Sequence, residues 1–222
     1  MSQDNETLHT RKVSREEWNG FVALARLDGP GDGLNRCIQS AYLTMNRTLV
    51  GIAKSPNADD WRRSMTDCLR EKLAALTCRP TWNQDEFDTW HRDTASRLVQ
   101  TAENPDFDFT VGQAQKWINV SIKNAVALGD RLMPSLSCVY DVAHVALDRI
   151  VLGELRRRDW MPRRLLQGPW SQLTDYGEYM MCQRLIRENL PGIPLEEEFH
   201  IWEEGRRSNQ PAGVLYQAKG RA

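Results

Sequence analysis

The sequence predicts an all-α protein of about eight helices. Apolar residues recur at spacings of three and four along most of the chain, and alternating apolar and polar stretches of useful length are missing. Residues that begin or end helices stand between these apolar stretches. With 222 residues, 41% of them hydrophobic, the chain is long enough to bury a substantial core.

The first predicted helix covers about residues 15–28. Ser14-Arg15-Glu16-Glu17 is a capping box, in which the serine and the second glutamate each satisfy a free backbone amide. The glycine-rich loop from Asp28 to Gly33 ends this helix. The run that follows, GLNRCIQSAYLTMNRTLVGIAK, predicts a second helix that ends before Ser55-Pro56.

Two further helices are predicted before the middle of the chain. Trp61, Met65, Leu69, Leu73 and Leu76 recur at helical spacing and predict a helix over 58–76. A similar stripe that begins at Phe87 predicts a helix over 83–103.

The segment from Phe109 to Val126, FTVGQAQKWINVSIKNAV, predicts a central helix over 111–128. Its apolar residues lie on nearly every side, which is typical of a helix packed among other helices. Its start nevertheless carries Gly112, Gln113, Gln115 and Lys116, residue types that suit contact with a phosphate or a sugar. The alternative is an ordinary helix start with a solvated lysine.

Three helices follow in the second half of the chain. Asp148 is well placed to cap a helix over about 149–158. Thr174-Asp175 begins another helix, which Leu190-Pro191-Gly192 ends. Pro194 predicts the start of a final helix that runs through Trp202.

These elements predict one helical domain over residues 11–205, with flexible tails over 1–10 and 206–222. The N-terminus has no apolar signal region and no apolar run is long enough for a bilayer, so we expect a cytoplasmic protein without membrane contact. The five cysteines are odd in number, widely spaced and without a C-x-x-C motif. We expect reduced thiols and no zinc site.

The charge distribution is more informative than the total. The chain has 29 basic and 30 acidic residues, so its formal charge of −1 indicates neither a nucleic-acid-binding nor a membrane-surface protein. Residues 111–164, however, contain nine Lys and Arg residues against five Asp and Glu residues. This segment is a local basic region.

Two segments carry a resemblance to a known family. G-Q-A-Q-K, Gly112 to Lys116, followed by an apolar helix, is similar to the G-x-G-x-K hairpin segment of the helix-hairpin-helix DNA glycosylases, with Ala114 in place of the second glycine. VALDRIVLGELRRRDW, Val145 to Trp160, resembles the segment that carries the catalytic aspartate of that family. Lys116 matches the lysine and Asp148 the aspartate, and the resemblance covers about 50 residues.

The resemblance implies a helix-hairpin-helix DNA glycosylase-like fold and a hydrolase that breaks the N-glycosidic bond of a base. Asp148 would stabilise the oxocarbenium-like sugar or activate the nucleophile. If Lys116 reaches the same carbon, its amine forms a Schiff base and adds AP-lyase activity; otherwise water attacks. The cysteine cluster that binds an iron–sulfur centre in some relatives is missing, so no cofactor is expected. Asp148 as a plain helix cap is the alternative.

Double-stranded DNA is the partner that this function requires. Contacts to its phosphates are predicted for Gly112, Gln113 and Gln115 and for the arginines Arg156, Arg157, Arg158, Arg163 and Arg164. A base flipped out of the duplex needs an aromatic wall. The candidates for this wall are Trp82, Trp117, Tyr140 and Trp170. The alternative is a place in the core, which is the commoner one for such side chains.

We therefore expect a monomeric, metal-independent enzyme that excises a damaged or modified base in DNA repair or in antiviral defence against foreign DNA. One alternative is a helical DNA-binding or interaction module without catalysis. Another is a metal enzyme that uses Glu197 with His200 or Asp88 with His91. Catalysis requires Asp148 and Lys116 in one cleft, whereas a binding module can carry them on separate surfaces.

Overall fold

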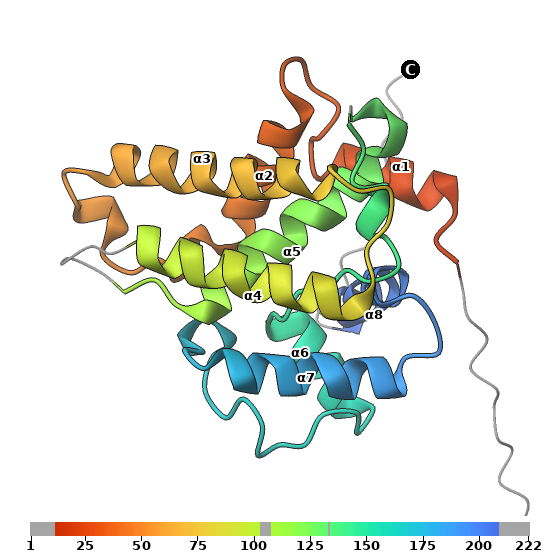
Figure 1. Ribbon diagram of the computed structural model, residues 1–222. Coiled ribbons are helices and arrows are strands. Elements are labelled where there is room, and N and C mark those ends of the chain that lie inside the picture. Colours follow the sequence, from red (N-terminus) through yellow and green to blue (C-terminus); the bar gives the residue numbers. More distant parts are fainter. Residues whose placement is uncertain (1–11, 103–107, 133, 209–222) are drawn as a thin grey trace, which may run out of the picture.

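The computed structural model describes residues 12–102, 108–132 and 134–208, which form eight α-helices, five short 3-10 helices and no strand (Figure 1). This confirms the prediction of an all-α protein with about eight helices. The helices are α1 Arg15–Leu24, α2 Gly33–Met45, α3 Ala58–Leu76, α4 Gln84–Thr101, α5 Val111–Leu128, α6 Arg149–Arg157, α7 Tyr176–Asn189 and α8 Pro194–Ser208.

Helix starts agree closely with the sequence signals. Ser14 and Glu17 form the predicted capping box of α1, and Asp148 caps α6 by accepting from the amides of Ile150 and Val151. α5 also begins with a capping box, in which the Thr110 side chain accepts from the amide of Gln113. Polar side chains thus satisfy backbone groups that a helix start leaves free.

The second helix is shorter than predicted, because α2 ends at Met45 and not near Lys54. Thr44 and Thr48 donate their hydroxyls to carbonyls three residues earlier, where they compete with helical hydrogen bonds. Gly51 then adopts the left-handed conformation with φ 96°, which turns the chain. Two 3-10 helices, η1 Asn46–Thr48 and η2 Ile52–Lys54, replace the predicted continuation.

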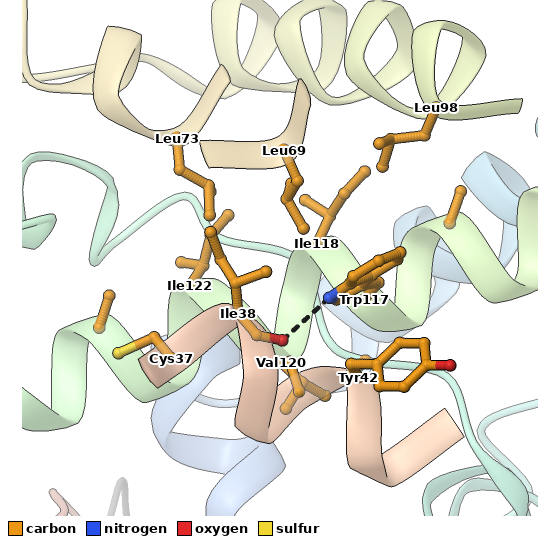
Figure 2. Close-up of a cluster of buried hydrophobic side chains, with 14 of the residues drawn as sticks. Cys37, Ile38, Tyr42, Leu69, Leu73, Leu98, Trp117, Ile118, Val120 and Ile122 are labelled. Atoms are coloured by element: carbon orange, nitrogen blue, oxygen red, sulfur yellow. Dashed lines mark hydrogen bonds between the residues drawn. The ribbon is translucent and has the colours of Figure 1, made fainter. Parts of the chain in front are cut away.

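Helix α5 is the central element of the fold. It contacts α1, α2 and α4, and every residue in it except Val111 and Val126 is buried. Figure 2 shows how Trp117 and Ile118 of α5 lie among side chains of its neighbours, including Ile38, Leu69 and Leu98. The prediction of a central helix that is buried on all sides is confirmed.

A second hydrophobic cluster lies between the elements of the C-terminal half. It contains Val151 and Leu155 of α6, Tyr179 and Ile186 of α7, and Ile201 of α8. Trp170, in the 3-10 helix η5 Trp170–Gln172, and Tyr176 pack against this cluster and against the one around α5. The two clusters therefore meet beside the start of α5.

Two further predictions concern the flexible tails and the reduced cysteines. Residues 206–208 belong to α8, whereas the other predicted tail residues lie outside the described part of the chain. The cysteines are free thiols; Cys37 and Cys182 are buried, Cys68 and Cys138 are half-buried, and Cys78 is exposed. Within the described ranges, none of the helices has the length and apolar character needed to cross a bilayer.

Candidate active site

The segment Val145–Leu147, directly before α6, is buried although it belongs to no helix. Side chains satisfy its backbone. Gln183 accepts from the amide of Val145 (3.1 Å) and donates to its carbonyl (2.8 Å), and Gln115 does the same for Leu147 (3.1 and 2.8 Å). The amide of Ala146 donates to Glu198 (3.1 Å). Three polar side chains thus make the backbone hydrogen bonds that a buried segment outside a helix would otherwise form with a neighbouring strand.

This arrangement fixes the Asp148 side chain at the start of α6. Its Oδ1 accepts from the amides of Ile150 and Val151, both at 2.9 Å, and its Oδ2 accepts from Lys116 Nζ at 2.6 Å. The carboxylate is therefore held on both oxygens, by the helix start on one side and by α5 on the other.

Burial and charge act in opposite directions on Asp148. The side chain of Lys116 is 6% exposed and that of Asp148 is 14% exposed. Burial alone would raise the pKa of Asp148, but the Lys116 ammonium and the amide of Val151 hold this pKa below its usual value. Asp148 is therefore ionised at neutral pH and carries the negative charge that a cationic transition state requires.

A second buried ion pair lies two turns further along α5. Lys123 Nζ donates to Glu198 Oε1 at 2.5 Å, and the other oxygen of Glu198 accepts from Ala146. Lys116 and Lys123 are seven residues apart and so lie on the same face of the helix. Glu198 thus compensates the second lysine and also supports the segment that leads to Asp148.

Both ion pairs lie beside a pocket of about 680 Å³. Lys116, Val120 and Lys123 form its α5 side, and Asp148 lies with them. The remaining lining includes aromatic side chains, Phe21, Trp170 and Trp202, and cationic ones, Arg26, Arg47 and Arg149. A pocket of this size accommodates a nucleotide-sized ligand. The structure thus brings Lys116 and Asp148 into one cleft, the arrangement that the proposed chemistry requires.

The other residues singled out at the start of α5 have protein partners. The amide of Gly112 donates to the carbonyl of Leu173 (2.8 Å), and a Cβ on Gly112 would lie 1.9 Å from the Trp170 carbonyl oxygen. Gln113 donates to the carbonyl of Thr48, and Gln115 contacts Leu147. The glycine therefore allows a close approach of two backbones, and the structure does not bring Gly112, Gln113 or Gln115 to the pocket.

The predicted DNA-binding arginines lie on and after α6. Arg156 donates to the carbonyls of Leu165 and Leu166, Arg157 pairs with Glu154, and Arg158 pairs with Glu204. Arg163 and Arg164 are exposed. A shallow depression of about 500 Å³ is shared by Arg156, Arg157 and Arg163. These arginines lie outside the lining of the Asp148 pocket.

Of the four aromatic residues proposed for the base pocket, only Trp170 lines it. Trp117 is fully buried and donates its indole N–H to the carbonyl of Ile38, so it has no face for a ligand (Figure 2). Trp82 donates to the carbonyl of Leu76 and lies against Arg79. Tyr140 donates its hydroxyl to Glu196. The placement of Trp117 corrects its proposed stacking role.

His91, one of the two histidines considered as metal ligands, belongs to a hydrogen-bonded network that also contains His144. His144 Nε2 lies 2.7 Å from Asp88, and its Nδ1 lies 2.9 Å from the hydroxyl of Tyr179. His91 contacts Tyr176 and Asn119. In the described part of the chain, no three His, Cys, Asp or Glu side chains lie close enough together to bind a metal ion.

Several residues of the site were missed in the sequence. They are Arg26, Arg47, Lys123, Arg149, Gln183, Glu198 and Trp202. Only Lys123 carries a local signal, because its spacing of seven residues from Lys116 places both lysines on one helical face. The others come from distant segments that meet only in the folded chain.

Comparison of the chain with protein-family models, with curated proteins and with solved structures gives no match. The interpretation of the pocket therefore depends on its own geometry and chemistry.

Proposed function

We propose that the protein is a DNA glycosylase that excises a damaged or modified base in the pocket beside α5. The observation that carries this proposal is the Lys116–Asp148 pair, 2.6 Å apart, beside a pocket with aromatic and cationic walls. Base excision requires a fixed carboxylate, a planar surface for the base and positive charge for the phosphates. The pocket offers all three.

Asp148 would act on the sugar of the flipped nucleotide. Departure of the base leaves positive charge on the sugar ring, and an ionised carboxylate that already has its orientation stabilises this charge without reorganisation. Because Ile150 and Val151 bind one oxygen through their amides, the other oxygen, which accepts from Lys116, is the one available to the sugar.

Lys116 has two possible roles in this reaction. In the free protein it donates to Asp148 as an ammonium, which has no lone pair for attack. If Lys116 loses a proton to solvent as the sugar enters, its amine attacks the anomeric carbon while the bond to the base breaks. Opening of the sugar ring then gives a Schiff base, which leads to strand cleavage. If it keeps the proton, water attacks and Lys116 orients Asp148.

The decisive experiment compares two aspartates that both cap helices. Asp148→Asn keeps the shape and the cap but removes the charge, so base release should fall on the order of a hundredfold or more. Asp175→Asn is the matched control, because Asp175 caps α7 through the amide of Gly177 and lies outside the pocket lining. Oligonucleotides that carry oxidised, alkylated, deaminated or hypermodified bases are incubated with each variant, and alkali-labile sites are scored. Full activity of Asp148→Asn would refute the mechanism.

Borohydride separates the two roles of Lys116. A Schiff base is reduced to a stable protein–DNA adduct, which should be lost together with strand cleavage in Lys116→Gln. The other outcome is that the unmodified protein gives no adduct and that Lys116→Gln still releases the base. Lys116 would then only orient Asp148, and water would be the nucleophile.

A further inference from the structure

We infer that Arg26, Arg47 and Arg149 bind phosphates of the DNA strand on either side of the nucleotide that enters the pocket. This inference rests on the proposed function, since it names the DNA contacts of the same pocket. It differs from the sequence prediction, which assigned the phosphates to the start of α5 and to the arginines between positions 156 and 164.

The three arginines come from separate parts of the chain. Arg26 follows the end of α1, Arg47 lies in η1, and Arg149 is the first residue of α6. All three are exposed and all three line the pocket that contains Asp148. Three elements therefore present a guanidinium group to one opening.

The basic residues around the pocket differ in whether an acidic partner neutralises them. Lys116 is paired with Asp148, and Lys123 with Glu198. Within the described residues, the guanidinium groups of Arg26, Arg47 and Arg149 have no hydrogen-bonding or ion-pair partner. The uncompensated positive charge therefore lies on the exposed arginines of the lining, while the buried lysines are neutralised. An anionic ligand is the partner that this distribution favours.

The backbone of Arg26 supports a role for its side chain. Helix α1 ends in a Schellman motif, in which Leu27 donates to the carbonyl of Val22 and Arg26 donates to that of Ala23. Arg26 has φ 56°, a conformation that favours glycine. Asp159 holds the same position after α6 and does not line the pocket, so the backbone alone does not mark a site. At Arg26 the strained position also places a cation at the pocket.

A phosphodiester strand fits the chemistry better than a small carboxylate. Guanidinium groups bind phosphate oxygens through two parallel hydrogen bonds, and three separate arginines match phosphates that are spaced along a strand. Trp170 and Trp202 provide planar surfaces for a base in the same pocket. The arginines Arg156, Arg157 and Arg158 differ in having protein partners already.

The test measures DNA binding without turnover. The full chain carries Asp148→Asn, and the ligand is a fluorescein-labelled 21-base-pair duplex that contains a tetrahydrofuran abasic-site analogue. Combining Arg26→Gln, Arg47→Gln and Arg149→Gln should reduce the slope of log affinity against log salt concentration by about 2.7, or about 0.9 for each lost phosphate contact. The control combines Arg63→Gln, Arg70→Gln and Arg97→Gln, exposed arginines of α3 and α4 outside the pocket lining, and should keep the slope.

Arg26→Gly adds a test that loss of folding cannot mimic. Glycine relieves the left-handed backbone, so this variant should melt at a higher temperature than the parent protein and yet bind the duplex more weakly. A salt slope that stays unchanged in the triple pocket variant, or falls equally in the control, would overturn the inference. Equal affinity for the duplex and for thymidine 5′-monophosphate would also overturn it, because the site would then recognise a free nucleotide.

Failure of this inference and failure of the proposed function are distinguishable. Base release by the unmodified protein, with binding that does not depend on the three arginines, would refute the phosphate site alone. Arginine-dependent binding by a protein that releases no base would refute the glycosylase and keep the phosphate site.

Discussion

The two polar faces of helix α5 differ in the way their buried groups are satisfied. On the face toward the pocket, Lys116 and Lys123 are charged and paired with Asp148 and Glu198. On the face toward α4 and α7, Asn119 joins a network of side chains that also contains Asp88, His91, His144, Tyr176 and Tyr179. One helix therefore supports a charged site and a network of largely neutral groups.

The network follows one consistent direction of hydrogen bonds, assigned from its partners. Tyr176 donates to His91, whose other nitrogen donates to Asn119; Asn119 donates to Tyr179. Tyr179 then donates to His144, which donates to Asp88. Asp88 also accepts from Arg187 and Gln84. Every donor in this series therefore has an acceptor.

The comparison shows which buried polar groups suggest function. The groups of the network are satisfied by one another, which is what stability requires of buried polar atoms. On the pocket face, charged lysines lie beside an opening. Asp148 at the start of α6 and Glu198 of α8 supply their counter-charges. A buried polar residue thus suggests a functional site only when one side of it still faces an opening after its protein partners are in place.

The largest expected effect is on the pocket face. Glu198→Gln preserves size but leaves the Lys123 ammonium without a counter-charge, which should lower the free energy of unfolding by about 3 to 5 kcal/mol. Glu204→Gln is the control, because Glu204 pairs with Arg158 at the surface, and it should change stability by less than about 1 kcal/mol. Urea unfolding measures both. Similar values for the two variants would remove the distinction between the buried and the exposed pair.

The second effect is the pH dependence of the network face. Burial lowers the pKa of His91 well below 6.5 and also lowers that of His144. Below about pH 6.5 the unfolded chain therefore binds protons that the folded chain does not, and stability should fall as the pH falls. The slope can reach about 2.7 kcal/mol per pH unit for two such histidines. Unfolding midpoints between pH 7.5 and 5 measure it, and His144→Gln should reduce the slope by up to half.

The smallest of the three effects concerns a single hydroxyl of the network. Tyr179→Phe keeps the ring but removes the group that accepts from Asn119 and donates to His144, so stability should fall by about 2 kcal/mol. Base release measured below the melting temperature should stay at the level of the unmodified protein. A large loss of activity in folded Tyr179→Phe would show that the two faces of α5 act together.

Much of the fold could be predicted from the sequence because its signals are local. Helical spacing located α3, and an apolar run located α5, at their observed bounds, and Asp148 was identified as the cap of α6. The end of α2 was missed because Thr44 and Thr48 compete with the helix through side-chain hydrogen bonds, which apolar spacing does not reveal.

The candidate site could be predicted only in part. Lys116 and Asp148 stand out as single residues, and their proximity was proposed from a resemblance of short motifs. Gln183 and Glu198 support the segment before Asp148 from two other helices, and nothing in their own neighbourhoods indicates this contact. Gln115 was interpreted as a ligand contact, yet its amide binds the backbone of Leu147. A buried glutamine is suited to either role, and only the fold decides between them.

The side-chain support of Val145–Leu147 has a consequence for the order in which the chain folds. Its contacts span 32 residues to Gln115, 38 to Gln183 and 52 to Glu198. Closing such long loops costs chain entropy before any contact is gained, so local helices form first. During synthesis, α5 and α6 leave the ribosome before Glu198 does. The backbone support of the segment before Asp148 is therefore complete only when α8 docks, and we expect the candidate active site to be completed late in folding.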